Sequence, residues 1–154
     1  LTFAAPDVGA TNRIREIASY FNAEMVICDK HRKRANEIAS MVVIGDVTDR
    51  DVVIIDDICD TGGTLAKSAG LLKEKGARSV RALITHPVLS GKAYENIENS
   101  VLEELIVCDT IPLRKESPKI KMLSVAELFA VAIRNAYENK SITSLFIHSQ
   151  RRDK

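Results

Sequence analysis

The sequence predicts an α/β protein with a mostly parallel sheet and helices on both faces. Short apolar, β-branched runs alternate with amphipathic stretches of helical period, which is typical of strand–helix–strand units. The run Val-Val-Ile-Ile at 52–55 has the composition of a strand buried on both faces, as parallel strands are. No repeat, low-complexity segment or linker divides the 154 residues. We therefore expect one domain over 1–140, followed by a C-terminal strand and frayed tail over 141–154.

The first half of the chain is expected to hold four strands and two helices. Its predicted strands are apolar runs bounded by turn or polar residues: 1–5, 25–28, 41–45 and 51–57. Thr11 or Asn12 is expected to cap a helix that runs to about Phe21, because apolar residues recur there at helical spacing. A second helix is expected over 64–75, with Gly76 as its C-terminal stop.

The second half continues the alternation. Strands are expected at three further apolar runs: 79–85, 105–108 and 142–147. A short helix is expected over 91–97 and a polar loop over 114–119. Ser124 is expected to cap a helix to about Tyr137, because Glu127 stands three residues later, as in a capping box.

Composition excludes several classes of protein. The chain has 22 Lys and Arg against 21 Asp and Glu, a net charge of +1, which argues against a nucleic-acid partner held by bulk charge. No apolar run approaches the roughly 20 residues that span a bilayer, so no membrane partner is expected. Cys28, Cys59 and Cys108 form no C-x-x-C pair, which favours packing roles and a reducing, cytoplasmic setting.

The strongest functional signal directly follows the strand at 52–55. Three carboxylates, two threonines and two glycines lie together there: Asp56, Asp57, Asp60, Thr61, Gly62, Gly63 and Thr64. The glycines allow close approach of backbone to a ligand and a positive φ. The predicted helix from Thr64 directs free backbone N–H groups and its positive dipole end at the same point, and the threonines add hydroxyl donors. Together these features predict a phosphate cradle.

The carboxylates beside this cradle indicate a sugar phosphate. Asp56 and Asp57 stand where they could accept hydrogen bonds from sugar hydroxyls or hold Mg²⁺. Because adjacent strand residues point to opposite faces, one of the pair could instead brace the loop. Neither G-x-x-x-x-G-K-[ST] nor G-x-G-x-x-G occurs, so the usual nucleotide cradles are absent. The alternative interpretation is a tight turn with a good helix cap.

The 52–64 string resembles the phosphoribosyl-diphosphate (PRPP) loop that type I phosphoribosyltransferases share with ribose-phosphate pyrophosphokinases. Further segments resemble the pyrophosphokinase family in sequence order: 4–10, 29–37, 85–91, 108–112 and 141–146. The resemblance implies a type I phosphoribosyltransferase-like, Rossmann-like fold. The family chain is about twice as long, and its N-terminal half, with most of the ATP site, has no counterpart here. Because the chain opens on Leu1 within an apparent strand, we expect it to be a C-terminal half.

The reaction that this resemblance implies moves the β,γ-diphosphoryl group of ATP to O1 of ribose 5-phosphate, giving PRPP and AMP for nucleotide biosynthesis. Lys30 and Arg32, in the charged loop expected over 30–39, match the family's catalytic Lys and its neighbouring Arg. Cations suit this chemistry because negative charge spreads over the oxygens of the displaced phosphorus. Arg32 is also expected to contact ribose 5-phosphate. The alternative for this basic run is a solvated charged surface or a patch for RNA.

The resemblance also implies roles for the PRPP-loop residues. Residues 60–64 are expected to hold the 5-phosphate, and Asp56 a ribose hydroxyl, with Asp57 beside it. A carboxylate next to a phosphate is unfavourable electrostatically, so we expect Asp60 to order the loop by accepting backbone N–H bonds.

Asp7 matches a metal-contacting Asp of the family, which makes Mg²⁺ the expected cofactor. The alternative for Asp7 is an Asx turn after Pro6. Ala10 stands where the family has a second Gly, and it would cost about 1 kcal/mol if that position needs a positive φ.

The implied partners are ribose 5-phosphate and ATP as substrates and phosphate and ADP as possible regulators. The full-length family forms homo-oligomers, typically hexamers. Without the ATP half, we expect this chain to bind ribose 5-phosphate, phosphate or sulfate but to turn over poorly.

Three other functions stay open. A phosphoribosyltransferase that consumes PRPP would need a hood that stacks on a nucleobase, and only 5% of residues are aromatic. A non-catalytic subunit that binds a pyrophosphokinase would not need an intact PRPP loop with Lys30 and Arg32. A transcription regulator that senses PRPP would need a basic DNA-binding face.

Overall fold

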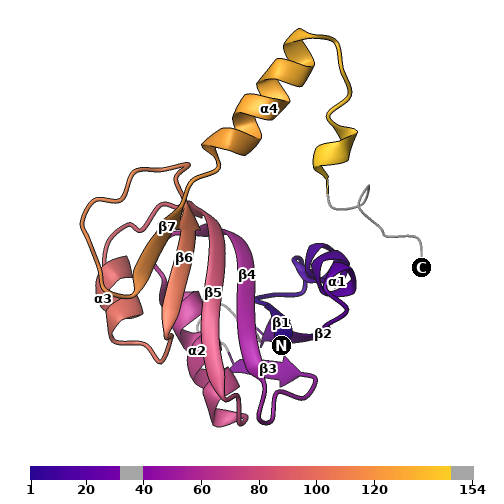
Figure 1. Ribbon diagram of the computed structural model, residues 1–154. Coiled ribbons are helices and arrows are strands. Elements are labelled where there is room, and N and C mark those ends of the chain that lie inside the picture. The colour runs from indigo at the N-terminus through magenta and orange to yellow at the C-terminus, as the bar shows by residue number, and fades with distance from the viewer. Residues whose placement is uncertain (32–39, 147–154) are drawn as a thin grey trace.

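Residues 1–31 and 40–146 are described by a computed structural model of the chain, in which one seven-stranded sheet is flanked by helices (Figure 1). The strand order is β3-β2-β1-β4-β5-β6-β7, and every neighbouring pair is parallel except β2 with β3. The strands are β1 (Thr2–Ala5), β2 (Glu24–His31), β3 (Ser40–Ile44), β4 (Asp51–Cys59), β5 (Ser79–Pro87), β6 (Glu104–Cys108) and β7 (Ile120–Leu123). The helices are α1 (Thr11–Tyr20), α2 (Gly63–Glu74), α3 (Ala93–Glu98) and α4 (Ala126–Tyr137). The predicted α/β class is confirmed.

Helices cover both faces of the sheet, as predicted. α1 packs on one face through Ile14 and Ala18, and α2 packs on the other through residues that include Leu72. α3 shares the core of the α2 face. Because side chains alternate along a strand, β1 contributes to both cores, with Phe3 toward α1 and Ala4 toward α2.

The two central strands, β1 and β4, define where a ligand can enter. The chain leaves β1 through α1 toward one edge of the sheet, and leaves β4 through α2 toward the other edge. In open α/β sheets such a switch point opens a crevice at the carboxyl ends of the strands. The turn after β1 begins at Pro6 and the loop after β4 begins at Asp60, so both sequence motifs converge on this crevice.

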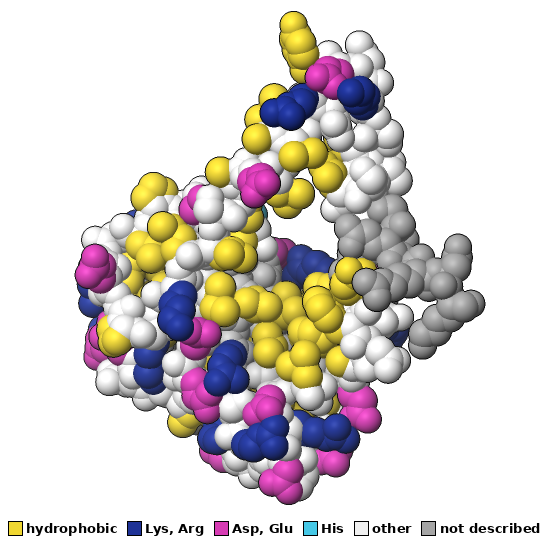
Figure 2. Space-filling model, in the orientation of Figure 1, with side chains coloured by type: hydrophobic (Ala, Val, Ile, Leu, Met, Phe, Trp, Pro, Cys, Tyr) yellow, Lys and Arg dark blue, Asp and Glu magenta, His cyan; other side chains and the backbone are white. Residues whose placement is uncertain are grey.

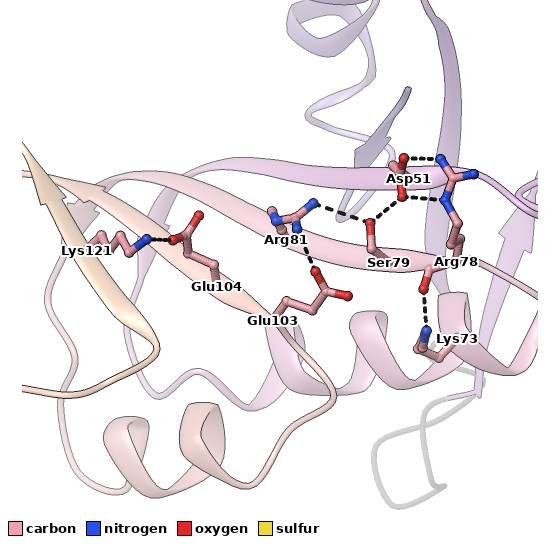
Figure 3. Close-up of polar contacts among 8 residues, drawn as sticks. All are labelled: Asp51, Lys73, Arg78, Ser79, Arg81, Glu103, Glu104 and Lys121. Carbon is pink, nitrogen blue, oxygen red and sulfur yellow. Dashed lines mark hydrogen bonds and ion pairs between the residues drawn. The ribbon is translucent and has the colours of Figure 1, made fainter.

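A row of polar contacts joins the strands at the opposite, amino end of the sheet (Figure 3). Asp51 pairs with Arg78 and accepts a hydrogen bond from Ser79 Oγ at 2.6 Å. Arg81 pairs with Glu103 at 2.7 Å. The Arg78 guanidinium beside Asp51 holds the pKa of that carboxyl well below its usual range. These pairs join the beginnings of neighbouring strands, far from the crevice.

α4 projects away from the sheet and buries none of its residues (Figure 1). Its start is held by Asp109, whose carboxylate accepts hydrogen bonds from the Ser124 hydroxyl and from the Val125 N–H, the latter at 2.9 Å. Figure 2 shows hydrophobic side chains gathered along α4 and over the sheet below it. α4 is therefore attached to the sheet by its first residues.

Two predicted helix caps are wrong. The N-cap position of α1 is Ala10, neither Thr11 nor Asn12, and no side chain caps the helix. The N-cap position of α4 is Val125 and not Ser124, although the Ser124 hydroxyl accepts the N–H of Ala126 at 3.3 Å while it donates to Asp109.

The predictions at the C-terminal end also need correction. The strand predicted at 142–147 is wrong, since Thr143–Leu145 form a 3₁₀ turn in which Ser141 Oγ accepts the Thr143 N–H at 3.1 Å. Such local bonds from serine compete with extended structure. β7 was not predicted, because its four residues are too few to show a strand period, and only the first of them, Ile120, is buried. The frayed tail predicted for 149–154 lies outside the described residues.

The cysteines of the chain are free thiols, and two of them are core residues. Cys28 and Cys59 are buried and Cys108 is half-buried. Burial raises the pKa of Cys28 and of Cys59 to about 11, which keeps both protonated and unreactive near neutral pH. Within 1–31 and 40–146, the helices are all too short or too polar to cross a membrane.

Candidate functional site

A cavity of about 260 Å³ lies at the carboxyl ends of β1 and β4. One wall is the turn after β1, with Pro6 and Asp7, and the other is the end of β4 with the loop that follows it. Most of the residues predicted for the phosphate and sugar site line this cavity: Asp7, Asp56, Asp60, Thr61, Gly62 and Thr64. Residues 50 positions apart in the sequence are thus brought together.

The loop between β4 and α2 has the backbone geometry of an anion cradle. α2 begins at Gly63, and Gly62 before it has a left-handed φ of +70°. The N–H groups of the first turn have no carbonyl partner within the helix, and no side chain caps this helix. Of the two glycines predicted to need a positive φ, only Gly62 does. The helix starts one residue earlier than predicted, and its dipole end points at the same loop.

Asp56 and Asp57 do not point to opposite faces as simple strand alternation would place them, because one guanidinium reaches both carboxyls. Asp56 lines the cavity, whereas Asp57 does not and has 56% of its side chain exposed. Arg13 of α1 joins them, with Nη1 at 3.0 Å from Asp57 Oδ2 and Nη2 at 3.4 Å from Asp56 Oδ1. Arg13 was not among the predicted site residues. Its place in the first turn of the helix that follows the Asp7 turn was the available signal.

The two carboxyls of this pair titrate differently. Burial raises the pKa of Asp56 to about 6, and the neighbouring carboxylates of Asp57 and Asp7 add to the effect. The hydrogen bond from Arg13 lowers the pKa of Asp57. Asp56 is therefore the carboxyl that gains most from a ligand able to donate hydrogen bonds or positive charge.

Asp60 is held by a neighbour from the next connection of the sheet. Its carboxylate accepts a hydrogen bond from Ser90 Oγ, and its backbone carbonyl accepts one from the Ser90 N–H at 3.0 Å. The side chain thus orders the loop, but through a serine hydroxyl and not through the backbone N–H bonds expected from the sequence.

Asp7 forms the turn that its alternative interpretation described and also lines the cavity. Its Oδ1 accepts the Ala10 N–H at 2.9 Å, as in an Asx-type turn. Ala10 has a φ of −77°, so the residue that replaces the family's glycine is not strained.

The acidic residues of the cavity suit a hard cation only together with a ligand. In the described ranges no group of three or more His, Cys, Asp or Glu could hold a metal by itself. Asp7 and Asp56 nevertheless face one cavity, and the carboxylate of Asp7 helps to raise the pKa of Asp56. Mg²⁺ is commonly held by one or two carboxylates plus substrate phosphates, and this pair fits that mode.

Of the two basic residues predicted to be catalytic, Lys30 and Arg32, the structure describes only the backbone of Lys30. The backbone of Lys30 belongs to β2, which is longer than predicted and pairs with β3 up to His31. Arg32 lies outside the described residues, as does most of the loop predicted at 30–39.

A family model and the most similar curated relatives agree on one family for this chain. The model of the phosphoribosyl synthetase-associated domain matches residues 15–147. Ribose-phosphate pyrophosphokinases of Campylobacter jejuni and Wolinella succinogenes are each 54% identical, over 143 and 144 residues, covering 93% and 94% of this chain. Those alignments cover 46% and 47% of the relatives, so the chain spans about half their length.

Solved structures give the same fold. The phosphoribosylpyrophosphate synthetase of Mycobacterium smegmatis has a TM-score of 0.82 at 33% identity, over 90% of this chain and 45% of that one. An adenine phosphoribosyl transferase of Trypanosoma brucei has a TM-score of 0.53 at 20% identity, over 84% of this chain and 68% of that one, a likeness of fold alone.

Proposed function

The chain belongs to the phosphoribosyl synthetase-associated domain family, and on that premise we propose that it is the ribose 5-phosphate-binding half of a ribose-phosphate pyrophosphokinase. The proposed reaction is attack of ribose O1 on the β-phosphorus of ATP. The new bond joins O1 to the β-phosphorus, the bond from that phosphorus to the α,β-bridging oxygen breaks, and AMP leaves with the oxygen. O1 loses its proton, and the products are PRPP and AMP.

The 5-phosphate is assigned to the loop between β4 and α2. A monoester dianion suits the unpartnered N–H groups and positive dipole end at the start of α2. The hydroxyls of Thr61 and Thr64, both at the cavity wall, supply further donors. This anchor would fix the far end of the sugar.

The ribose hydroxyls are assigned to Asp56. It lines the same cavity as the phosphate loop, and a carboxylate accepts hydrogen bonds from a diol. Of the two carboxyls that Arg13 holds, Asp56 lines the cavity and Asp57 does not, so Asp56 is the acceptor assigned to the sugar. Phosphate and diol contacts together would hold O1 in one orientation, which lowers the entropic cost of reaction.

Lys30 and Arg32 are proposed as the cations that stabilise charge on the transferred group. Asp7, with Asp56, is proposed to hold Mg²⁺ jointly with substrate oxygens. The ion, when bound, would neutralise phosphate charge. ATP is the proposed second substrate, and the cytoplasm, where free thiols persist, is the proposed setting.

The observation that carries this proposal is the single cavity that joins Asp56 to the phosphate loop. Calorimetry with ribose 5-phosphate and with inorganic phosphate tests it. Asp56→Ala should weaken ribose 5-phosphate about tenfold or more, since a charged acceptor is lost, and leave phosphate binding unchanged. Asp57→Ala, the matched control, should change both affinities less. Failure of the unaltered chain to bind either ligand would contradict the proposal.

The catalytic assignment needs a longer chain that includes an ATP site. In such a protein, AMP release from ATP and ribose 5-phosphate should fall about 100-fold for Lys30→Ala, by analogy with other preorganised donors. An unchanged rate would remove Lys30 from the mechanism. Activity with PRPP and a nucleobase, but none with ATP, would instead indicate a phosphoribosyltransferase.

A further inference from the structure

A segment that the proposed function leaves unused lies behind the phosphate loop. It comprises residues 88–98, follows β5 and contains α3; we call it the bracket. Its first part belongs to the segment 85–91, which resembles the pyrophosphokinase family and has no predicted role. In Figure 1, α3 lies on the same side of the sheet as α2.

The bracket donates hydrogen bonds to three consecutive carbonyl groups of the loop. The Leu89 N–H donates to the Cys59 carbonyl at 3.1 Å, and the Ser90 N–H to the Asp60 carbonyl at 3.0 Å. The Asn96 side-chain amide donates to the Thr61 carbonyl at 2.8 Å. Every peptide unit between residues 59 and 62 is thus held from one side.

Holding these carbonyls also sets the direction of the N–H groups. In a trans peptide the C=O of one residue and the N–H of the next point to opposite sides, and no cis bond occurs in the described residues. The N–H groups of Asp60 and Thr61 therefore point away from the bracket. The third of these N–H groups, that of Gly62, donates a hydrogen bond to the Cys59 sulfur.

The bracket is itself immobilised by packing. Leu89, Ala93 and Ile97 are at most 2% exposed. A Cβ at Gly62 would stand 3.3 Å from the Ala93 carbonyl oxygen and 3.3 Å from Ile97 Cγ1, so loop and bracket touch. A rigid support of this kind can fix donors before a ligand arrives.

We propose that Ser90 and Asn96 are positioning residues for the 5-phosphate, because they hold the carbonyls of Asp60 and Thr61 toward the bracket, which directs the Thr61 N–H away from it and fixes the peptide unit after Thr61. The inference rests on the proposed function, since it needs a phosphate in the loop. Neither residue touches the ligand. Ser90 acts through the carboxylate and carbonyl of Asp60, and Asn96 through the carbonyl of Thr61.

The test measures affinity for inorganic phosphate and for ribose 5-phosphate by calorimetry on the 154-residue chain. Asn96→Ala removes the bond to the Thr61 carbonyl, and Ser90→Ala removes the hydroxyl bond to the Asp60 carboxylate but keeps the backbone bond to the Asp60 carbonyl. Each variant should weaken both ligands by the same factor, about fivefold to tenfold, the loss expected for one hydrogen bond. Asn96→Gln keeps the amide donor and should recover part of the loss. Asn135→Ala is the matched control, because Asn135 also donates its amide to a carbonyl, that of Ser141 at 3.3 Å, but in the α4 region.

Melting temperatures separate a positioning role from a merely structural one. A positioning role should leave the melting temperature of the ligand-free variants within a few degrees of the unaltered chain, while the increase in that temperature produced by phosphate shrinks. A merely structural role should instead lower the melting temperature of the ligand-free variants. Undiminished phosphate affinity in both Asn96→Ala and Ser90→Ala would overturn this inference and leave the proposed function standing. Absence of binding by the unaltered chain would overturn both.

Discussion

α2 and α4 each have 12 residues, yet only one of them is built into the fold. α2 buries Leu65, Ser68, Ala69 and Leu72 against the sheet, and its N-terminus closes the candidate site. α4 is the more apolar of the two and buries nothing. Its four large aliphatic and aromatic residues from Leu128 to Ile133 are between 37% and 67% exposed. Burial of a helix thus follows from what it is connected to, and apolar content alone does not decide it.

Connection explains the difference. α2 leaves the central strand β4 and returns to its neighbour β5, so the chain is forced back across the sheet. α4 leaves β7, an edge strand, and no further strand of the sheet follows it in the described residues. The anchor at Asp109 directs the first turn of α4, and no residue of the helix is buried against the described part of the chain. The candidate site accordingly depends on α2 and not on α4.

The sharpest test of this comparison replaces one leucine in each helix. Leu72→Ala should lower the free energy of unfolding by about 3 kcal/mol, because Leu72 is fully buried and a cavity would remain. Leu128→Ala, at a residue 50% exposed, should change it by less than about 0.5 kcal/mol. Urea denaturation measures both. Equal losses would mean that α4 is packed as firmly as α2.

A second test compares two glycines of the α2 region. Gly62→Ala should cost about 1–2 kcal/mol, because φ is +70° and the new methyl would crowd Ala93 and Ile97. Binding of phosphate should fall with it. Gly70→Ala, in the helix interior with open space around it, should instead stabilise the chain by up to about 1 kcal/mol. A neutral Gly62→Ala would contradict the close contact between loop and bracket.

Two tyrosines provide a smaller contrast. The Tyr94 hydroxyl accepts the N–H groups of Arg114 and Lys115 at 3.0 and 3.4 Å. Tyr94→Phe should therefore cost about 1 kcal/mol in urea denaturation, since two backbone donors lose their acceptor. Tyr137→Phe, at a side chain 88% exposed at the end of α4, should have no measurable effect. A loss at residue 137 as large as that at residue 94 would break the contrast.

The smallest expected effect concerns the anchor of α4. Bonds from Ser124 and Val125 lower the pKa of Asp109, so ionised Asp109 stabilises the anchored state. That contribution is present above the usual carboxyl pKa and is lost as the pH falls through the lowered one. Hydrogen exchange at the first turn of α4 should be faster in Asp109→Asn than in the unaltered chain at neutral pH. At strongly acidic pH the exchange rates of the two proteins should converge. A difference in exchange rate that does not depend on pH would count against the anchor.

Several features could be predicted because they depend on neighbours in the chain. The run 52–55 is apolar on both sides, and it forms the centre of a buried parallel strand. Gly76 ends α2 with a φ of +95°, as expected of a C-terminal glycine. The order Asp56, Asp60, Thr61, Gly62 directly after a strand was enough to locate the candidate phosphate loop.

Other features depend on contacts that no local pattern reveals. Arg13 meets Asp57 from 44 residues away, and Ser90 meets Asp60 from 30. β7 has only four residues, too few to show a period, and α1 and α4 each have an apolar residue, Ala10 and Val125, at the N-cap position where a polar one was expected.

Local composition by itself therefore determined the class of fold, the central strand and the place of the loop, since strand burial and backbone freedom are properties of adjacent residues. Only the tertiary structure decided which carboxyl of the Asp56–Asp57 pair faces the cavity and what supports the loop from behind. Those outcomes depend on distances between segments that the folded sheet brings together. The same dependence on connection leaves α4, an apolar helix, anchored at its first turn and unburied among the described residues.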